Sequence, residues 1–229
     1  MRQIEFITPD QYYADNLNDW ISPATPDWFA NLQLGGQLTR TAKTCPSFVE
    51  LFRDSYLLRA PCDITITYQG RDSNHDDIVS WVCAGSLPYV DSHNLHDQMG
   101  PEWSSKYVSI KLGLRTVPKA SEPIKCMTLP LDYHKPRGPR LKSMMGIIPI
   151  HNQNFEMQLN MVTDLQELIS NPEISIKVGE PLGLLYFPGG KPKVCSTCVP
   201  QAEYDTKYKY ERVTWYGDFV RKTKGLIFK

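Results

Sequence analysis

Two cysteines near the end of the chain have a spacing that zinc ligands often have. Cys195 and Cys198 are separated by two residues, and two thiolates at this spacing can bind one zinc ion. A closed zinc site needs four ligands, and the sequence holds no second Cys-x-x-Cys pair. The missing ligands would come from distant residues such as Cys45, Cys62 or a histidine. We therefore favour a plain surface turn without a cofactor here, with zinc binding and a disulfide or redox pair as alternatives.

A second group of chemically active side chains is formed by His93, His96 and Asp97, to which Asp91 and His134 could be added. Two histidines and one carboxylate form the iron site of non-haem oxygenases, which cupin-like barrels carry. In that pattern the ligands begin on a rigid strand, two residues apart. These histidines are three apart in a polar segment, so we favour a hydrated loop and keep a cupin-like, metal-dependent enzyme as an alternative function.

Positive charge is concentrated in two stretches of the sequence. Residues 135–142 carry four cationic side chains, Arg137 and Arg140 among them, and no acidic one. Residues 206–229 carry seven cationic and two acidic side chains, with aromatic residues interleaved. Cations beside aromatic rings are typical of proteins that bind single-stranded nucleic acid, because cations bind phosphates and rings stack on bases. Binding of single strands is therefore another alternative function.

The chain as a whole is not basic, which argues against a general nucleic-acid binder. It has 25 Lys plus Arg and 25 Asp plus Glu, so its formal net charge is zero, whereas phosphate contacts supply most of the affinity for nucleic acid. Trp215 and Tyr216 lie in an alternating stretch of the tail, which favours a terminal strand with its aromatic rings facing inward. A docking arm on a neighbouring subunit is a further alternative, because Tyr, Trp and Arg are enriched at interface centres.

Several other classes of protein are disfavoured. The sequence has no Gly-x-Ser-x-Gly nucleophile motif and no phosphate-binding Gly-x-x-x-x-Gly-Lys-Ser/Thr loop. No segment approaches the ~18 consecutive apolar residues of a membrane helix. The first residues turn polar quickly, so we expect no signal peptide and no membrane partner. Four of the six cysteines are isolated in the sequence, and reduced thiols are the default for them.

Alternating apolar residues predict many short strands. Ile64, Ile66 and Tyr68 share one face of a strand, and Phe155 to Met161 show the same period of two. Residues 46–53 have helical spacing and predict one short helix. We therefore expect a mostly β protein, an antiparallel β-sandwich or barrel of jelly-roll or β-clip type, with extended terminal arms. The expected organisation is an N-terminal strand and arm at 1–44, a β body at 45–200, and a basic, aromatic strand or tail at 201–229.

The N-terminal arm carries large aromatic side chains among polar residues, Pro and Gly. Trp20, Trp28 and Phe29 lie in a segment without clear periodicity. Exposed aromatic surface is unfavourable, so we expect these residues to pack on the body or on a partner.

Four groups of residues carry a resemblance to known proteins. They are Arg40 to Pro46 followed by Tyr56 to Asp63, His96-Asp97-Gln98, Leu129-Pro130-Leu131 followed by Gly146-Ile147-Ile148, and Val178 to Leu182. Together they resemble a family of uncharacterised phage and bacterial β proteins. The resemblance covers about residues 40 to 188, and it implies a β-barrel or sandwich that is often phage-encoded. The last two groups also resemble the barrel of deoxynucleotide-triphosphate hydrolases, but the carboxylate that such an enzyme needs is missing after residue 148.

These observations favour a non-enzymatic, phage-encoded protein that acts by assembly with other proteins. Its partners would be other protein subunits, either a homo-oligomer or components of a phage particle, located in the host cytoplasm or the virion. The expected contact residues are Trp20, Trp28, Phe29, Trp215 and Tyr216.

Overall fold

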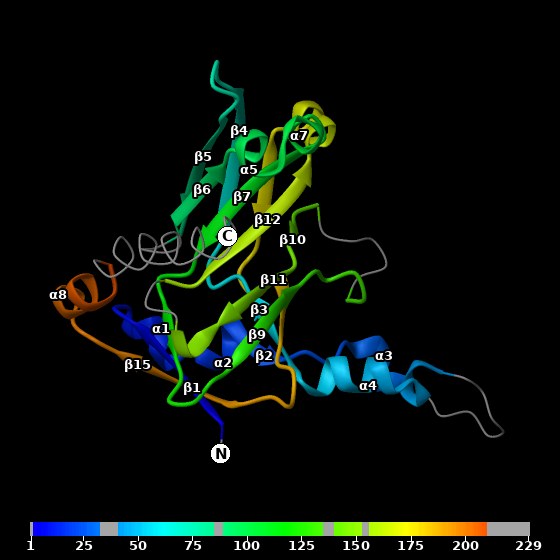
Figure 1. The fold of residues 1–229 in the computed structure, drawn as a ribbon, viewed down its shortest axis with the longest axis vertical. Coiled ribbons are helices and arrows are strands. Elements are labelled where there is room, and N and C mark those ends of the chain that lie inside the picture. Colours follow the sequence, from blue (N-terminus) through cyan, green and yellow to red (C-terminus); the bar gives the residue numbers. More distant parts are fainter. Residues whose placement is uncertain (1, 33–40, 85–88, 135–139, 153–155, 210–229) are drawn as a thin grey trace, which may run out of the picture.

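The computed structural model describes residues 2–32, 41–84, 89–134, 140–152 and 156–209. These residues form a mostly β structure of four sheets in which nearly all strand pairs are antiparallel, as the sequence predicted. Each sheet is open in this part of the chain, so the arrangement is sandwich-like and no closed barrel is formed. Strands β4 to β7 and β12 lie in the upper part of the molecule, and β1, β2, β3, β9 and β11 lie in the lower part (Figure 1).

The upper part contains two sheets, and these include the longest strands of the described chain. The four-stranded sheet has the order β10-β12-β7-β6, and the three-stranded sheet has the order β13-β4-β5. In β12, Leu159 and Met161 are buried and lie opposite Leu112 and Ile110 of β7, so the period-two pattern becomes a buried face. The strands are β4 (Ile64–Arg71), β5 (Asp77–Cys83), β6 (Tyr89–His93), β7 (Tyr107–Gly113), β10 (Lys142–Ser143), β12 (Gln158–Asp164) and β13 (Glu173–Ile176).

The lower part contains a five-stranded and a second three-stranded sheet. Their orders are β11-β9-β14-β3-β2 and β15-β1-β8. The pair of β1 and β15 is parallel and joins the two ends of the described chain. The strands are β1 (Gln3–Thr8), β2 (Ile21–Pro23), β3 (Ser55–Arg59), β8 (Val117–Lys119), β9 (Lys125–Leu129), β11 (Gly146–Pro149), β14 (Pro181–Tyr186) and β15 (Lys193–Cys198).

The helices are short and lie at the ends of strands. The predicted helix at 46–53 is α4, which begins at a proline, but the described residues contain eight α-helices rather than one. None of the helices in these ranges is long and apolar enough to cross a membrane. They are α1 (Gln11–Asp15), α2 (Leu17–Trp20), α3 (Asp27–Asn31), α4 (Pro46–Arg53), α5 (Leu95–Met99), α6 (Pro101–Ser104), α7 (Leu165–Ser170) and α8 (Gln201–Tyr204), with the helical turns η1 (Ala42–Thr44), η2 (Ile150–Asn152) and η3 (Asp205–Lys209).

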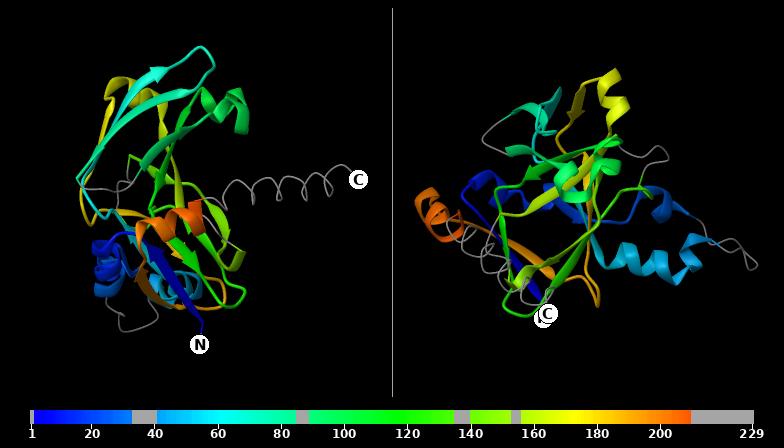
Figure 2. Two further views of the ribbon diagram at one scale, coloured as in Figure 1. Left: turned by 90° about the vertical axis from the view of Figure 1, so that its left-hand side faces the viewer. Right: turned by 45° about the horizontal axis from the view of Figure 1, so that its top comes forward.

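The N-terminal segment packs on the body, which is one of the two placements that the sequence predicts, but it is folded into the core rather than an extended arm. One large apolar cluster contains Ile4, Phe6, Tyr13 and Trp20 together with residues of the upper sheets. Figure 2 shows this segment (blue) folded against the lower strands, at the opposite end from the β4–β5 hairpin (cyan). The segment could not remain extended in water, because its apolar side chains supply one wall of the core.

Candidate functional site

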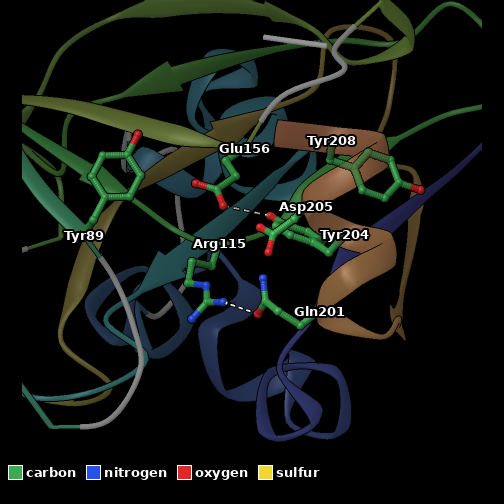
Figure 3. Close-up of a pocket in the computed structure, with 7 residues that line it drawn as sticks. All are labelled: Tyr89, Arg115, Glu156, Gln201, Tyr204, Asp205 and Tyr208. Carbon is green, nitrogen blue, oxygen red and sulfur yellow. Dashed lines mark hydrogen bonds between the residues drawn. The ribbon is translucent and has the colours of Figure 1, made fainter. Parts of the chain in front are cut away.

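A pocket of about 310 Å³ lies where β6, β7 and β12 meet the C-terminal helical segment α8 and η3 (Figure 3). Four separate segments of the chain contribute to its wall, and most of the contributing side chains are aromatic or charged. The lining residues are Tyr89, Arg115, Glu156, Gln201, Tyr204, Asp205 and Tyr208.

The ring of Tyr89 can lie on the strand side of the pocket because the residue opposite it, Gly113, has no side chain. Tyr89 opens β6 opposite Gly113 of β7, and a Cβ atom at Gly113 would lie only 1.9 Å from Cε1 of the Tyr89 ring. Gln158, which also pairs with Gly113, donates a hydrogen bond from Nε2 to the Tyr89 hydroxyl at 2.5 Å. The glycine therefore lets the ring lie flat against the strand, and the amide fixes its outer end.

Arg115 has a backbone conformation that a non-glycine residue adopts only under constraint. Its φ is +43°, in the left-handed region. Its two neighbours are both bonded to the buried Met157: Leu114 N–H donates to the Met157 carbonyl at 3.0 Å, and Met157 N–H donates to the Thr116 carbonyl at 2.7 Å. These bonds hold the loop between β7 and β8 and keep Arg115 in this conformation. Strain of this kind often accompanies a functional side chain.

The guanidinium of Arg115 connects the loop to α8. Its Nη2 atom donates to Oε1 of Gln201, the first residue of α8, at 2.6 Å. In Figure 3 the Arg115 and Gln201 side chains close one end of the pocket below Glu156 and Asp205. The hydrogen bond to Gln201 thus holds the Arg115 guanidinium at the pocket.

Tyr204 forms the floor on the helical side. Its ring is buried with Ile7 and Val117, and its hydroxyl donates to Oε1 of Glu156 at 3.2 Å. Burial, and then the nearby Glu156 carboxylate, raise the pKa of the phenol above its usual range, so the hydroxyl keeps its proton. Tyr204 therefore acts as a fixed hydrogen-bond donor that orients the Glu156 carboxylate.

The pocket is lined by side chains of opposite charge. Arg115 supplies a guanidinium, Glu156 and Asp205 supply carboxylates, and tyrosine rings supply apolar wall. A guanidinium binds carboxylates or phosphates through paired N–H groups, and carboxylates accept hydrogen bonds from ammonium and hydroxyl groups. The arrangement suits a small ligand that carries both a donor and an acidic acceptor group.

The aromatic residues predicted as contacts have different positions. Trp20 is buried, and its Nε1 donates to the Tyr13 carbonyl at 3.1 Å; Phe29 is also buried. Both belong to the interior rather than to a contact surface. Trp28 is 40% exposed, and its Nε1 donates to the Tyr133 carbonyl at 2.6 Å. Trp215, Tyr216 and Arg137 lie outside the described residues.

Arg140 is engaged within the chain. Its guanidinium donates to the carbonyl oxygens of Glu167 and Asn171 at the end of α7, and to that of Glu173 at 2.5 Å. Its Nε atom is 3.0 Å from the Glu167 carboxylate. Arg140 therefore closes the C-terminal end of a helix, where a cation is favourable.

The proposed metal ligands are not brought together. Cys195 and Cys198 lie three residues apart in β15, so their side chains point to opposite faces, and the segment is a strand rather than the predicted turn. His93 ends β6 and contacts Gln98 at 2.9 Å, whereas His96 stacks on His75. In the described ranges no group of three or more His, Cys, Asp or Glu side chains could hold a metal ion.

Sequence reasoning missed the pocket because its residues are distant from one another in the chain. The usable signal was the spacing of Tyr204 and Tyr208, which share one face when the segment is helical. The sequence predicts a basic, aromatic strand or tail for residues 201–229, whereas residues 201–209 are helical. No protein-family model matches this chain, and no curated protein and no solved structure matches it.

Proposed function

We propose that this protein is a non-enzymatic binding protein whose pocket takes a small zwitterion of the size of an α-amino acid. The observation that carries the proposal is that Arg115, Glu156 and Asp205 line one cavity of about 310 Å³. The acid group of the ligand would bind the Arg115 guanidinium, and its ammonium group would bind the two carboxylates. The tyrosine rings would cover the remaining apolar part of the ligand.

Replacing Arg115 with glycine is expected to weaken binding roughly 10- to 100-fold, the usual loss for one hydrogen-bonded charge. Glycine accepts the left-handed conformation that Arg115 has, so the fold should be retained. Titration calorimetry with the standard α-amino acids measures the effect. His75→Gly is the matched control, because His75 has a φ of +64° and does not line the pocket.

Two results contradict the zwitterion proposal. The first is that no α-amino acid binds the unaltered protein at millimolar concentration. The second is that Arg115→Gly binds as tightly as His75→Gly. Amino acids whose carboxyl group is converted to an amide should bind more weakly to the unaltered protein, because they no longer offer an acid group to Arg115.

Assembly with other protein subunits is the second candidate function, and an exposed aromatic surface favours it. This surface is formed by Trp28, Phe48, Tyr133 and Val49. Trp28 packs edge-to-face on Phe48, and Phe48 packs on Tyr133. Trp28, Tyr133 and Val49 are 40%, 52% and 38% exposed. Trp and Tyr are enriched among the residues that dominate interface energies. The resemblance to phage proteins would place such an assembly in a virion or in the host cytoplasm.

Replacing Tyr133 with lysine tests whether this surface contacts a second copy of the chain. If the surface is an interface between copies, Tyr133→Lys should convert an oligomer into monomers, because a charge would be buried at the interface. Light scattering at matched concentration measures the change. Tyr12→Lys is the control, since Tyr12 is 57% exposed on α1. A monomeric unaltered protein, or equal dissociation by both variants, contradicts the interface.

A further inference from the structure

Cys62 and Cys83 are neighbours at the base of the β4–β5 hairpin. Cys83 is the last residue of β5 and pairs with Ile64, while Cys62 lies two residues before the start of β4. The pairing continues past the strand ends, because Ala84 N–H donates to the Asp63 carbonyl at 3.1 Å. Cys62 and Cys83 are therefore diagonal neighbours across an antiparallel pair, where side chains on one face can touch.

The two side chains lie close enough for the Cys83 thiol to raise the pKa of Cys62. Both cysteines pack against the main apolar cluster while remaining partly accessible. Burial, and then the neighbouring thiol, raise the pKa of Cys62 to about 11. These cysteines are isolated in the sequence, and only the pairing of β4 with β5 brings them together.

The buried hydroxyl of Tyr13 lies near the two cysteines. Tyr13 is a core residue with 2% exposure, and its hydroxyl finds no hydrogen-bond partner in the described residues. Burial first, and then Cys62, Asp10 and Cys83, raise the pKa of this phenol above its usual range. A buried hydroxyl without a partner is costly, and a nearby sulfur that becomes a thiolate would be an acceptor for it. Cys195 and Cys198 show no comparable arrangement, because their sulfurs contact backbone oxygens or Gln3.

We propose that Cys62 and Cys83 are a modification site that forms a reversible disulfide, with a small disulfide such as oxidised glutathione as the oxidant. One cysteine thiolate attacks a sulfur of oxidised glutathione, which breaks its S–S bond and releases one glutathione thiolate. The second cysteine thiolate attacks the protein sulfur of the mixed disulfide and releases the second glutathione. The protein loses two electrons and two protons, and the two glutathione molecules gain them.

The disulfide ties Cys62, two residues before β4, to the end of β5 and closes residues 63–82 into a loop. A cross-link restricts the unfolded chain more than the folded one, so the oxidised form is the more stable form. Its formation is faster at higher pH, because the raised pKa of Cys62 keeps the thiolate scarce near neutrality.

Incubation of the full chain with oxidised glutathione at about pH 8.5, which raises the thiolate fraction, tests the site. Peptide mass mapping should find one linked peptide pair that joins Cys62 to Cys83. The midpoint of thermal unfolding should rise by about 5–10 °C and return after dithiothreitol. Cys62→Ser and Cys83→Ser should show neither the link nor the rise, whereas Cys45→Ser should behave as the unaltered protein does.

Three results overturn the proposal. They are a stable mixed disulfide at either cysteine without the internal link, linked peptides that involve other cysteines instead, and a link that leaves the unfolding midpoint unchanged. Because the first measurements use the unaltered protein, a variant that fails to fold does not prevent the test.

Discussion

Replacing Arg71 with methionine is expected to lower the free energy of unfolding by about 3–5 kcal/mol at pH 7, the usual cost of leaving a buried charge unpaired. The Asp77 side chain is 1% exposed, and its Oδ1 lies 2.8 Å from Nη2 of Arg71. Arg71 also donates from Nη1 to the Ser104 carbonyl at 2.9 Å, which connects the β4–β5 hairpin to the end of α6. Methionine has similar length but offers no donor to either oxygen.

The loss of stability caused by Arg71→Met should be smaller in acid than at pH 7. Burial raises the pKa of Asp77 above its ordinary value of 3.8, although Arg71 opposes that effect. A carboxyl with a raised folded-state pKa stabilises the protein below the unfolded pKa and loses that contribution as the pH rises through the folded pKa. Without Arg71 the folded pKa rises further, so Asp77 takes up a proton at a higher pH. Near pH 4 the variant therefore carries less uncompensated charge than at pH 7.

Urea denaturation of the unaltered protein and Arg71→Met at both pH values measures these differences. The double variant Arg71→Met with Asp77→Leu should regain most of the lost stability, because it removes both charges. Lys177→Met is the control for an exposed pair, since Lys177 contacts Asp63 at the surface. A double variant as unstable as the single one, or an equal loss at both pH values, contradicts the expectation.

Strands with one buried face were predictable from sequence, and strands without such a face were not. Ile64 and Ile66, like Leu159 and Met161, alternate with polar residues and lie on buried faces as expected. The Cys195–Cys198 segment gave no such pattern, because its residues are small and none is fully buried. It is a strand because β1 pairs with it in parallel, and local residue types do not encode so distant a partner.

The N-terminal segment was misjudged for a related reason. Helices of four or five residues, such as α1 and α2, are too short to show a helical period. Trp20 therefore resembles an aromatic residue in a loop, although its ring lies 5.4 Å from that of Tyr13 in the core. The candidate pocket was even less predictable, because strands, a loop and the C-terminal helices must all be placed before its charges meet.

Replacing Gly113 with alanine is expected to cost about 1–3 kcal/mol of stability, the usual effect of excess volume in a packed site. The added Cβ would lie 1.9 Å from Cε1 and 2.4 Å from Cδ1 of the Tyr89 ring, so the ring must leave its place. The hydrogen bond from Gln158 to the Tyr89 hydroxyl is then lost, and one wall of the pocket opens. Any ligand bound in the pocket should bind more weakly as a result.

A double-mutant cycle separates this clash from the general effect of alanine in a strand. In a Tyr89→Ala background the ring is absent, so Gly113→Ala should be close to neutral, and the interaction energy should account for most of the cost. Gly146→Ala is the matched control, because its Cβ would meet only the Thr128 hydroxyl at 3.3 Å. Equal costs of Gly113→Ala with and without the Tyr89 ring would mean that the glycine is needed for the strand itself. The flat packing of Tyr89, and with it this side of the pocket, would then have another cause.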